Sequence, residues 1–194
     1  PNDSIGLFSV GDITVDLSDI NKPEKLMFSL SVNGTDYSNS YPLWVYPQRY
    51  NLGQLTKGIV ITDSITAEVE KKLVSGARVL LMPKSDMNTI GGLFQTDYWN
   101  YRMFKTICEN NHCPVSPGTL GILTDPGHPI FNSFPTDCHT DWQWFPVIKA
   151  SHPFILDGMP EEYLPIVQVI DNVERNHKLG LIFEMGVGKG RLLV

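Results

Sequence analysis

The chain has 194 residues, of which 42% are hydrophobic and 19% charged, a composition typical of a folded globular protein. The length fits one large domain, or a small domain followed by a medium one. The net charge is -6 and no block of Lys or Arg occurs, which argues against a surface for nucleic acid or anionic membranes. No apolar run of about 18 residues occurs, so no membrane span is predicted, and no signal peptide is visible.

The two ends of the chain have the character of strand sequence. The chain opens on Pro1 and stops at the apolar residues 192–194. Native termini are usually polar and frayed, so we expect a processed or excised chain that lacks sequence at one or both ends. A mature protein with a docked terminal strand is the alternative.

The first 47 residues have the pattern of β structure. Residues 26–32 alternate in side-chain type, and Asn33-Gly34 after them predicts a hairpin with a type I′ turn. Residues 41–46 then form the return strand, and residues 13–17 suggest an earlier one. Three strands bury too little surface to be stable alone. We therefore expect them to complete a sheet with other sequence or to pack on the domain that begins after the linker at residues 47–53.

From residue 58 the pattern changes to that of a βαβ unit. The apolar run GIVITD predicts a strand buried on both faces. Asp63 or Ser64 is suited to cap a helix that carries Ile65, Val69 and Leu73, with Gly76 as its stop. A second apolar run, ARVLLMP, comes next. Strand, helix and strand in this order imply a parallel pair with a right-handed crossover.

The rest of the chain mixes short strands with irregular segments. A second helix, capped at Thr96 or Asp97, is predicted to end near residue 110, and residues 121–124 form a short strand. A turn of helix is expected at 140–145, and strands at 164–171 and 179–185. Gly-rich residues 186–190 then turn the chain into a final antiparallel strand. The predicted fold is a flavodoxin-like three-layer α/β domain over 54–194, with a mostly parallel sheet, preceded by a β-sandwich-like element over 1–47.

Two motifs with a chemical interpretation have a simpler structural one. GVGKG at 186–190 lacks the spacing of a phosphate-binding loop and lies between two strands, so a hairpin turn is predicted. Glu184 is an acid within an apolar strand, so its carboxylate must be paired with a cation, exposed to solvent, or shifted in pKa. A carboxylate for glycoside hydrolysis is one interpretation; an ion pair with Arg191 across the hairpin is the favoured one.

No complete catalytic or metal-binding set is visible. Cys108, Cys113 and Cys138 form no CxxC pair, and we expect thiols, although Cys108 and Cys113 could bridge a short loop. None has the context of a nucleophile elbow, and Cys138 beside His139 is a weak pair. The spacing of the central acids and histidines matches no standard metal motif. These residues are Asp125, His128, Asp137, His139 and Asp141. We therefore predict no metal, no cofactor and no catalytic residue.

The loop at 118–145 is rich in aromatic residues. Trp142, Trp144 and Phe145, with Tyr98 and Trp99, could form a platform that stacks on sugar rings. A hydrophobic cluster that packs the domain is the favoured alternative. If sugar does bind, the expected residues are His139, Asp141, Trp142, Gln143 and Trp144.

The run PGTLGILTDPGHPIFNSFPTDCHTDWQW, the later PIVQVID and the closing LGLIFEMGVGKGRLLV resemble a C-terminal region of bacterial glycoside hydrolase family 2 proteins. These proteins are β-galactosidase-like or sugar-binding. Their region is flavodoxin-like and related to class I glutamine amidotransferases. The leading NGTDYSNSYPLWVYP resembles the end of an immunoglobulin-like β-sandwich. The resemblance covers most of the chain.

The resemblance implies a parent that hydrolyses glycosides with two carboxylates in a barrel. A barrel of about 250 residues has no room here, so the implied role is an accessory module. It would contact the catalytic and β-sandwich domains of a periplasmic or extracellular parent, and a homo-oligomer is possible. A carbohydrate-binding module and a stand-alone amidotransferase-like hydrolase are the alternative hypotheses.

Overall fold

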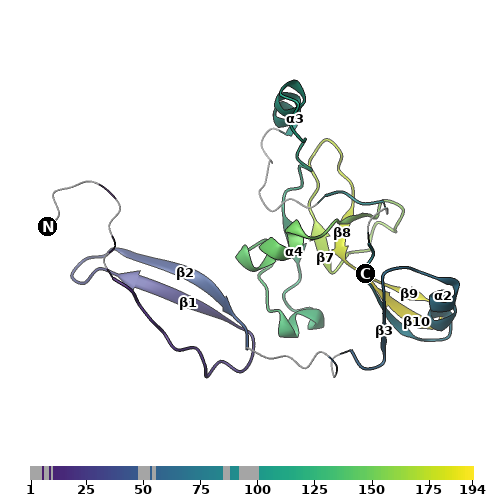
Figure 1. The fold of residues 1–194 in the computed structure, drawn as a ribbon, viewed down its shortest axis with the longest axis horizontal. Coiled ribbons are helices and arrows are strands. Elements are labelled where there is room, and N and C mark those ends of the chain that lie inside the picture. The colour runs from purple at the N-terminus through teal and green to yellow at the C-terminus, as the bar shows by residue number, and fades with distance from the viewer. Residues whose placement is uncertain are drawn as a thin grey trace. The chain divides into compact units, whose positions relative to one another are not determined.

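A computed structural model of the chain describes residues 6, 9, 11–47, 53, 56–84, 88–91 and 101–194. The chain divides between Tyr50 and Asn51 into two units, which we call unit 1 (1–50) and unit 2 (51–194). Figure 1 shows the ribbon of both units and labels some elements of each. No helix in the described part of the chain is long and apolar enough to cross a membrane.

Unit 1 contains one antiparallel hairpin. Strand β1 (Glu24–Ser31) pairs with β2 (Ser38–Val45), and the register places Leu26 opposite Leu43 and Phe28 opposite Tyr41. The side chains of two directly opposite residues share one face of a sheet. The apolar residues of both predicted strands therefore lie on the same face, which we call the hairpin apolar face. Its members are Leu26, Phe28, Leu30, Tyr41, Leu43 and Val45.

Two details of unit 1 differ from the prediction. The turn is not type I′, because Asn33 keeps a negative φ and only Gly34, at +78°, is positive. These signs match a type II turn, which needs glycine at its third position. The Val32 carbonyl accepts the Thr35 N–H at 3.1 Å. Residues 13–17 form no strand, since their alternating pattern is paired with no other strand in the part of the chain that the structure describes.

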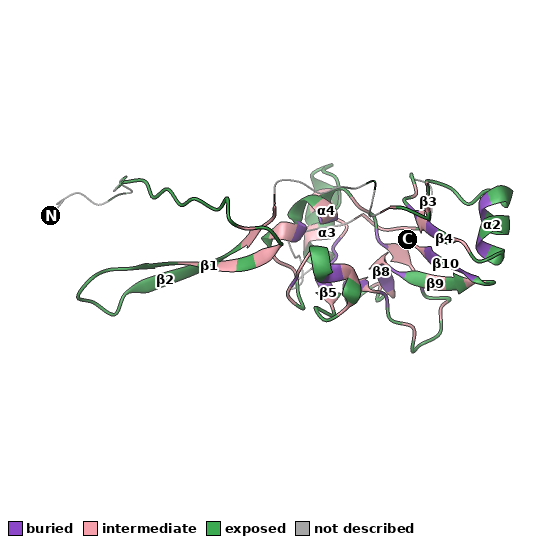
Figure 2. Ribbon diagram, turned by 90° about the horizontal axis from the view of Figure 1, so that it is seen from below, coloured by how far each residue is buried: buried purple, intermediate pink, exposed green. Residues whose placement is uncertain are grey.

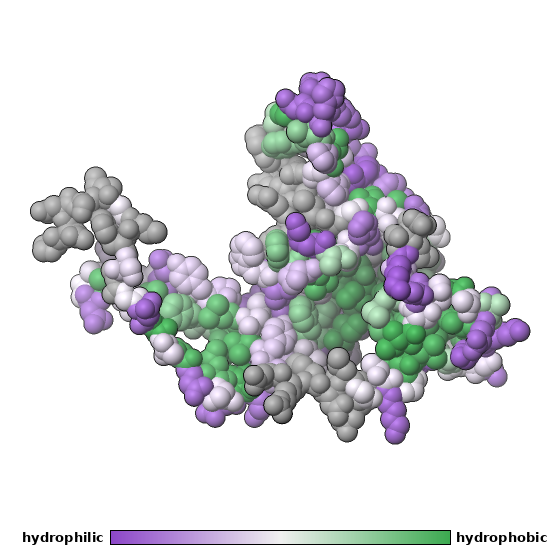
Figure 3. Space-filling view, in the orientation of Figure 1, coloured by the Kyte–Doolittle hydropathy of each residue, from purple (hydrophilic) through white to green (hydrophobic). Residues whose placement is uncertain are grey.

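The described part of unit 1 buries no residue. In Figure 2 its strands are exposed or intermediate, whereas the buried residues lie in unit 2. Leu30, Tyr41 and Leu43 are 45%, 51% and 47% exposed. Apolar side chains are visible at the surface of the hairpin in Figure 3. An isolated two-stranded hairpin is at best marginally stable in water.

Unit 2 begins with the predicted βαβ unit. Strands β3 (Ile59–Thr62) and β4 (Arg78–Leu81) are parallel neighbours, joined through α2 (Ala67–Val74). The helix cap is Thr66, whose side chain accepts the Val69 N–H at 3.3 Å. The predicted cap Asp63 is instead paired with Lys84 at 2.8 Å. β3 lies at a sheet edge, so Ile61 is 46% exposed rather than buried.

The C-terminal strands join this sheet. β9 (Glu184–Val187) and β10 (Gly190–Leu193) form the predicted antiparallel hairpin, and β10 lies parallel to β4. The strand order is β3-β4-β10-β9. The expected ion pair is present, with Arg191 Nη1 3.3 Å from Glu184 Oε1. One small core holds α2 against the sheet through Val69, Leu73, Val79, Leu81 and Leu192.

A second sheet in unit 2 is wholly antiparallel. It contains β5 (Ile122–Thr124), β6 (Phe154–Ile155), β7 (Val167–Val169) and β8 (Leu179–Ile182) in the order β5-β7-β8-β6. Two 3₁₀ turns, η1 (Pro129–Ser133) and η2 (Trp142–Trp144), and the short helix α4 (Phe145–Lys149) pack on it. The core residues are Ile122, Phe131, Trp144, Ile148, Val167, Val169 and Leu179.

The predicted strand 179–185 is divided between the two sheets. β8 ends at Ile182 and β9 begins at Glu184, with the buried Phe183 between them. The backbone of Phe183 exchanges two hydrogen bonds with that of Val194, at 3.1 and 2.9 Å. The predicted strand 179–185 therefore contributes to both sheets of unit 2, through β8 and β9.

Helix α3 (Tyr101–Asn110) is attached by polar contacts and has no buried residue. The Arg175 guanidinium lies 5.4 Å from the Tyr101 ring and donates to its hydroxyl at 3.4 Å. Arg175 is held in turn by the buried carboxylate of Asp171, whose side chain is 1% exposed. Arg102 pairs with Glu174 at 3.2 Å. The predicted caps Thr96 and Asp97 lie outside the described residues.

The predicted flavodoxin-like three-layer fold with a mostly parallel sheet is wrong. Only β3, β4 and β10 are parallel neighbours, and the other described pairs are antiparallel. A parallel pair needs a crossover of about a dozen residues, usually a helix, whereas β7 and β8 are joined by the nine residues 170–178, which form no helix. The βαβ unit is real, but the pattern does not continue along the chain.

Candidate functional site

The predicted sugar-binding residues surround η2, where their polar groups maintain the local fold. Asp141 caps η2 and accepts the Gln143 N–H at 3.1 Å. The Gln143 amide donates to Asp141 Oδ2 at 3.2 Å and to the Pro135 carbonyl at 2.9 Å. The imidazole Nδ1 of exposed His139 lies 3.0 Å from the Thr140 carbonyl. These bonds are made within the loop itself.

Trp144 belongs to the core of the antiparallel sheet. Its side chain is 1% exposed, and its indole Nε1 donates to Thr136 Oγ1 at 2.8 Å. The rings of Phe131 and Phe134 meet it edge-on, at 6.2 and 5.0 Å between centroids. Trp144 therefore packs the core, as the alternative interpretation expects, and its ring is not available to stack on a sugar.

Trp142 lies two residues earlier and is 79% exposed. Its ring is 6.4 Å from that of Phe145, which is 43% exposed, at an interplanar angle of 48°. Lys149 Nζ lies 5.8 Å from the Phe145 ring. Trp142 and Phe145 thus form an exposed aromatic pair. Tyr98 and Trp99, the other platform candidates, lie outside the described residues.

The described part of the chain shows neither a hydrogen bond between the Cys138 and His139 side chains nor a cluster of metal ligands. All three cysteines are free, as predicted, and Cys138 is exposed. His139 contacts the backbone through Nδ1 rather than the neighbouring thiol. No cluster of three His, Cys, Asp or Glu residues able to hold a metal occurs among the residues that the structure describes.

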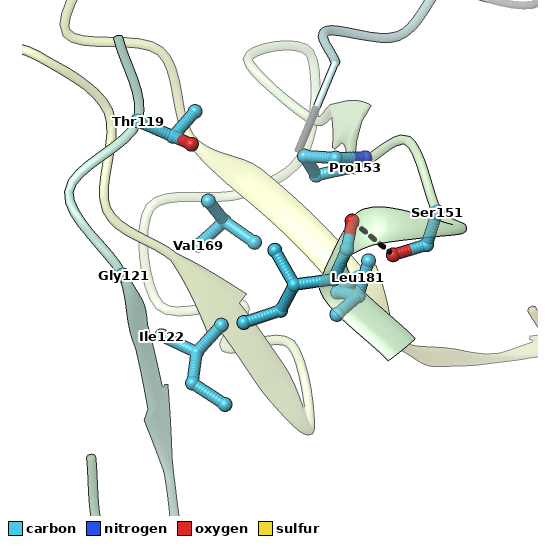
Figure 4. Close-up of a pocket in the computed structure, with 8 residues that line it drawn as sticks. Thr119, Gly121, Ile122, Ser151, Pro153, Val169 and Leu181 are labelled. Carbon is cyan, nitrogen blue, oxygen red and sulfur yellow. Dashed lines mark hydrogen bonds between the residues drawn. The ribbon is translucent and has the colours of Figure 1, made fainter. Parts of the chain in front are cut away.

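Two apolar spaces lie in unit 2. A small cavity of about 10 Å³ lies between β5, β7 and α4 (Figure 4). Beside it, the Ser151 hydroxyl donates to the Ile148 carbonyl. The cavity has at most the space of one water. A larger cleft of about 810 Å³ lies between the two sheets. Its lining is mainly apolar and includes Leu81, Met82, Val147, Phe154, Leu181 and Val194.

A third space, which we call the polar groove, has a volume of about 520 Å³. It gathers side chains from three distant segments, at 123–128, 163–168 and 184. It is lined by Leu123, Thr124, Asp125, His128, Tyr163, Leu164, Pro165, Ile166, Gln168 and Glu184. The pairing of β5 with β7 places Leu123 directly opposite Gln168. No motif in the sequence predicts this groove, because its residues lie in three separate segments. Asp125, His128 and Glu184 are each candidate residues in the sequence, but nothing in the sequence groups them.

One wall of the groove is held by Lys178. Its ammonium donates to the carbonyls of Pro160, Glu161 and Tyr163, at 2.8, 2.9 and 3.2 Å. Its backbone N–H donates to Asp157 at 2.8 Å. Asp157 also lies 2.7 Å from His177 Nδ1, and these two bonds lower the pKa of Asp157. The wall is thus fixed by charged and backbone groups together.

Tyr163 links this wall to β9. Its hydroxyl donates to the Glu184 carbonyl at 2.7 Å. Burial raises the pKa of Tyr163, and the nearby Glu184 carboxylate raises it further. The phenol therefore remains protonated at neutral pH and keeps this hydrogen bond.

Comparison with known families gives one match to each unit. A family model described as "Domain of unknown function (DUF8488)" matches residues 3–47, within unit 1. A second, described as "Domain of unknown function (DUF8487)", matches residues 60–194, within unit 2. No curated protein sequence matches the chain. Because the second model spans more than half of its length, the chain belongs to the DUF8487 family.

Proposed function

We propose that this chain is a non-catalytic accessory module of a larger parent protein, and that its role is in assembly. The proposed parent is a secreted, β-galactosidase-like protein of glycoside hydrolase family 2. The observation that carries the assembly role is the hairpin apolar face. It presents six apolar side chains on one side of two strands, yet no described residue of unit 1 is buried. The parent is suggested by the resemblance of residues 117–144, 165–171 and 179–194.

The chemistry of the face indicates what covers it. Full burial of a side chain such as Leu or Phe stabilises by about 1.5–3 kcal/mol. Covering several of them would stabilise a hairpin that is marginal alone. An alternating strand pair with one apolar face packs best against another sheet, as in a β-sandwich. The proposed partner is therefore a β-sheet of another domain of the parent polypeptide.

The intact gene product tests this proposal. We expect the gene to encode a barrel domain, and its product to hydrolyse p-nitrophenyl β-galactoside while this chain alone does not. Leu43→Asp places a charge on the hairpin apolar face and should lower the melting temperature of the intact product. Ser38→Asp, on the opposite face of the same strand, is the matched control. Turnover by this chain alone that is lost in Cys138→Ala would contradict the proposal.

A second candidate function, carbohydrate binding, is favoured by the exposed aromatic pair. Apolar ring faces stack on the C–H surfaces of sugars, and Trp142 is 79% exposed. Isothermal titration with galactosides and plant-polysaccharide oligomers should show heat that Trp142→Ala removes and Val173→Ala, another exposed apolar truncation, leaves intact. Absence of heat with every sugar would eliminate this candidate. The amidotransferase-like hydrolase hypothesis depended on the flavodoxin-like fold and is withdrawn with it.

A further inference from the structure

The polar groove goes beyond the proposed assembly role, which needs no ligand site, and it shares no residue with the aromatic pair of the carbohydrate-binding candidate. Its volume of about 520 Å³ falls within the range of about 300–1,000 Å³ for small-molecule sites. Apolar side chains such as Leu123 and Leu164 line it together with several polar groups. That combination is typical of a site that both holds and orients a ligand.

The polar groups define the chemistry of the ligand. The His128 Nδ1 accepts the Ile130 N–H at 3.3 Å, which places the imidazole proton on Nε2 as a donor. Asp125 and Glu184 contribute carboxylate acceptors, and the Gln168 amide both donates and accepts. A hydroxyl group satisfies all of these partners, because it donates one hydrogen bond and accepts two.

The charges in the groove argue against a diamine or a divalent cation. Such ligands need paired negative charge, but Arg191 already holds Glu184 at 3.3 Å. Asp125 Oδ1 accepts the Gly127 N–H at 2.9 Å, which restricts the orientation of the carboxylate. Lys178 and Tyr163 hold the wall in place without a ligand, so little ordering is required on binding.

We propose that the polar groove binds a neutral, polyhydroxylated ligand the size of one or two sugar rings. The hydroxyls contact Asp125, His128 and Gln168, and the apolar ring surface contacts Leu123 and Leu164. This site is separate from the aromatic pair in its residues and its test. The assembly role is tested on the hairpin, so failure of one proposal is distinguishable from failure of the other.

A titration of the ¹⁵N-labelled chain, followed by NMR, tests the inference. The probes are methyl β-D-galactoside, cellobiose and putrescine, each added to the millimolar range at low and high salt. We expect a saccharide to shift the Gln168 side-chain amide and the backbone amides of 123–128 and 163–168, with little dependence on salt. Gln168→Leu, of similar size, should weaken that binding about tenfold. Glu70→Gln, an exposed change on α2, should leave it unaltered.

Three results would overturn the inference. The first is no saturable shift in the groove with either saccharide, a readout on the unaltered chain that does not depend on any variant folding. The second is saccharide binding that Gln168→Leu leaves intact and Trp142→Ala removes. The third is salt-sensitive binding of putrescine alone, which would assign the groove to cations.

Discussion

Trp142 and Trp144 are alike in the sequence and opposite in their surroundings. The indole of Trp144 is enclosed by two phenylalanine rings and bonded to Thr136, whereas Trp142 is 79% exposed. The turn at η2 places residues two apart on different sides, and the hydrophobic pattern does not reveal which one faces inward. The sequence could identify an aromatic cluster here, but only the fold separates the packing residue from the surface one.

This difference predicts opposite effects of truncation. Trp144→Ala should lower the free energy of unfolding by about 3–5 kcal/mol, because it leaves a cavity in the core. Trp142→Ala should change it by less than about 0.5 kcal/mol, since the side chain lies at the surface. Urea denaturation followed by circular dichroism measures both. Equal losses in the two variants would contradict the assignment of Trp144 to the core.

A second prediction concerns the buried carboxylate of Asp171. Burial raises the pKa of Asp171, but bonds from Arg175 and from the His177 and Asn172 backbone outweigh it and hold the pKa below 3.8. A carboxyl with a lowered folded-state pKa stabilises the protein above its unfolded pKa, and that stability is lost as pH falls through the folded value. Asp171→Asn should therefore cost about 2 kcal/mol at pH 7, less than for a fully enclosed ion pair.

The pH dependence makes this prediction specific. The stability difference between the unaltered chain and Asp171→Asn should shrink as the pH falls below the ordinary pKa of the carboxyl, because the unfolded chain then takes up a proton before folded Asp171 does. Urea midpoints between about pH 3 and 7 provide the measurement. Glu68→Gln, which breaks only the exposed pair with Lys72, should change the midpoint only slightly across this range. A constant difference for Asp171→Asn across this range would refute the assigned role of the carboxylate.

At the scale of elements, the local signals located most strands and helices, but not the turn type at Asn33-Gly34, the cap of α2 or the unformed strand at 13–17. The βαβ unit, the β1–β2 hairpin and the β9–β10 hairpin all form where the sequence places them. Each depends on residues close in sequence: an apolar run, a cap, or glycines at a turn. The division of residues 179–185 between two sheets was not predicted, because an apolar run does not show which neighbour each strand will find.

The β9–β10 hairpin lies close enough to α2 to allow a test by one pair of glycines. A Cβ at Gly190 would overlap the carbonyl oxygens of Leu73 and Ala77, whereas at Gly186 it would meet nothing within 4 Å. Gly190→Ala should therefore cost about 1–3 kcal/mol, as overpacking does, and Gly186→Ala should cost much less. Thermal denaturation distinguishes them. Matching melting temperatures would show that β10 does not pack against α2 in this way.

At the scale of the whole molecule, the predicted fold class was wrong although many of its parts were right. The strands after residue 118 are short, and the connections 170–178 and 188–189 leave no room for a crossover helix, so β7 with β8 and β9 with β10 pair antiparallel. The polar groove could not be predicted, because its residues are brought together only by the β5–β7 pairing and the return of the chain at Glu184. Function at this scale depends on which surfaces remain for partners and ligands.

The hairpin apolar face is central to this account, and amide hydrogen exchange of the free chain tests it most directly. Amides of β4, β10, β7 and β8 should exchange slowly, because buried cores cover these strands. Amides of β1 and β2 should exchange at least about a hundredfold faster, since a two-stranded hairpin opens easily without a partner. Protection of β1 and β2 equal to that of the core strands would show that the hairpin is already stable, and the assembly role would lose its basis.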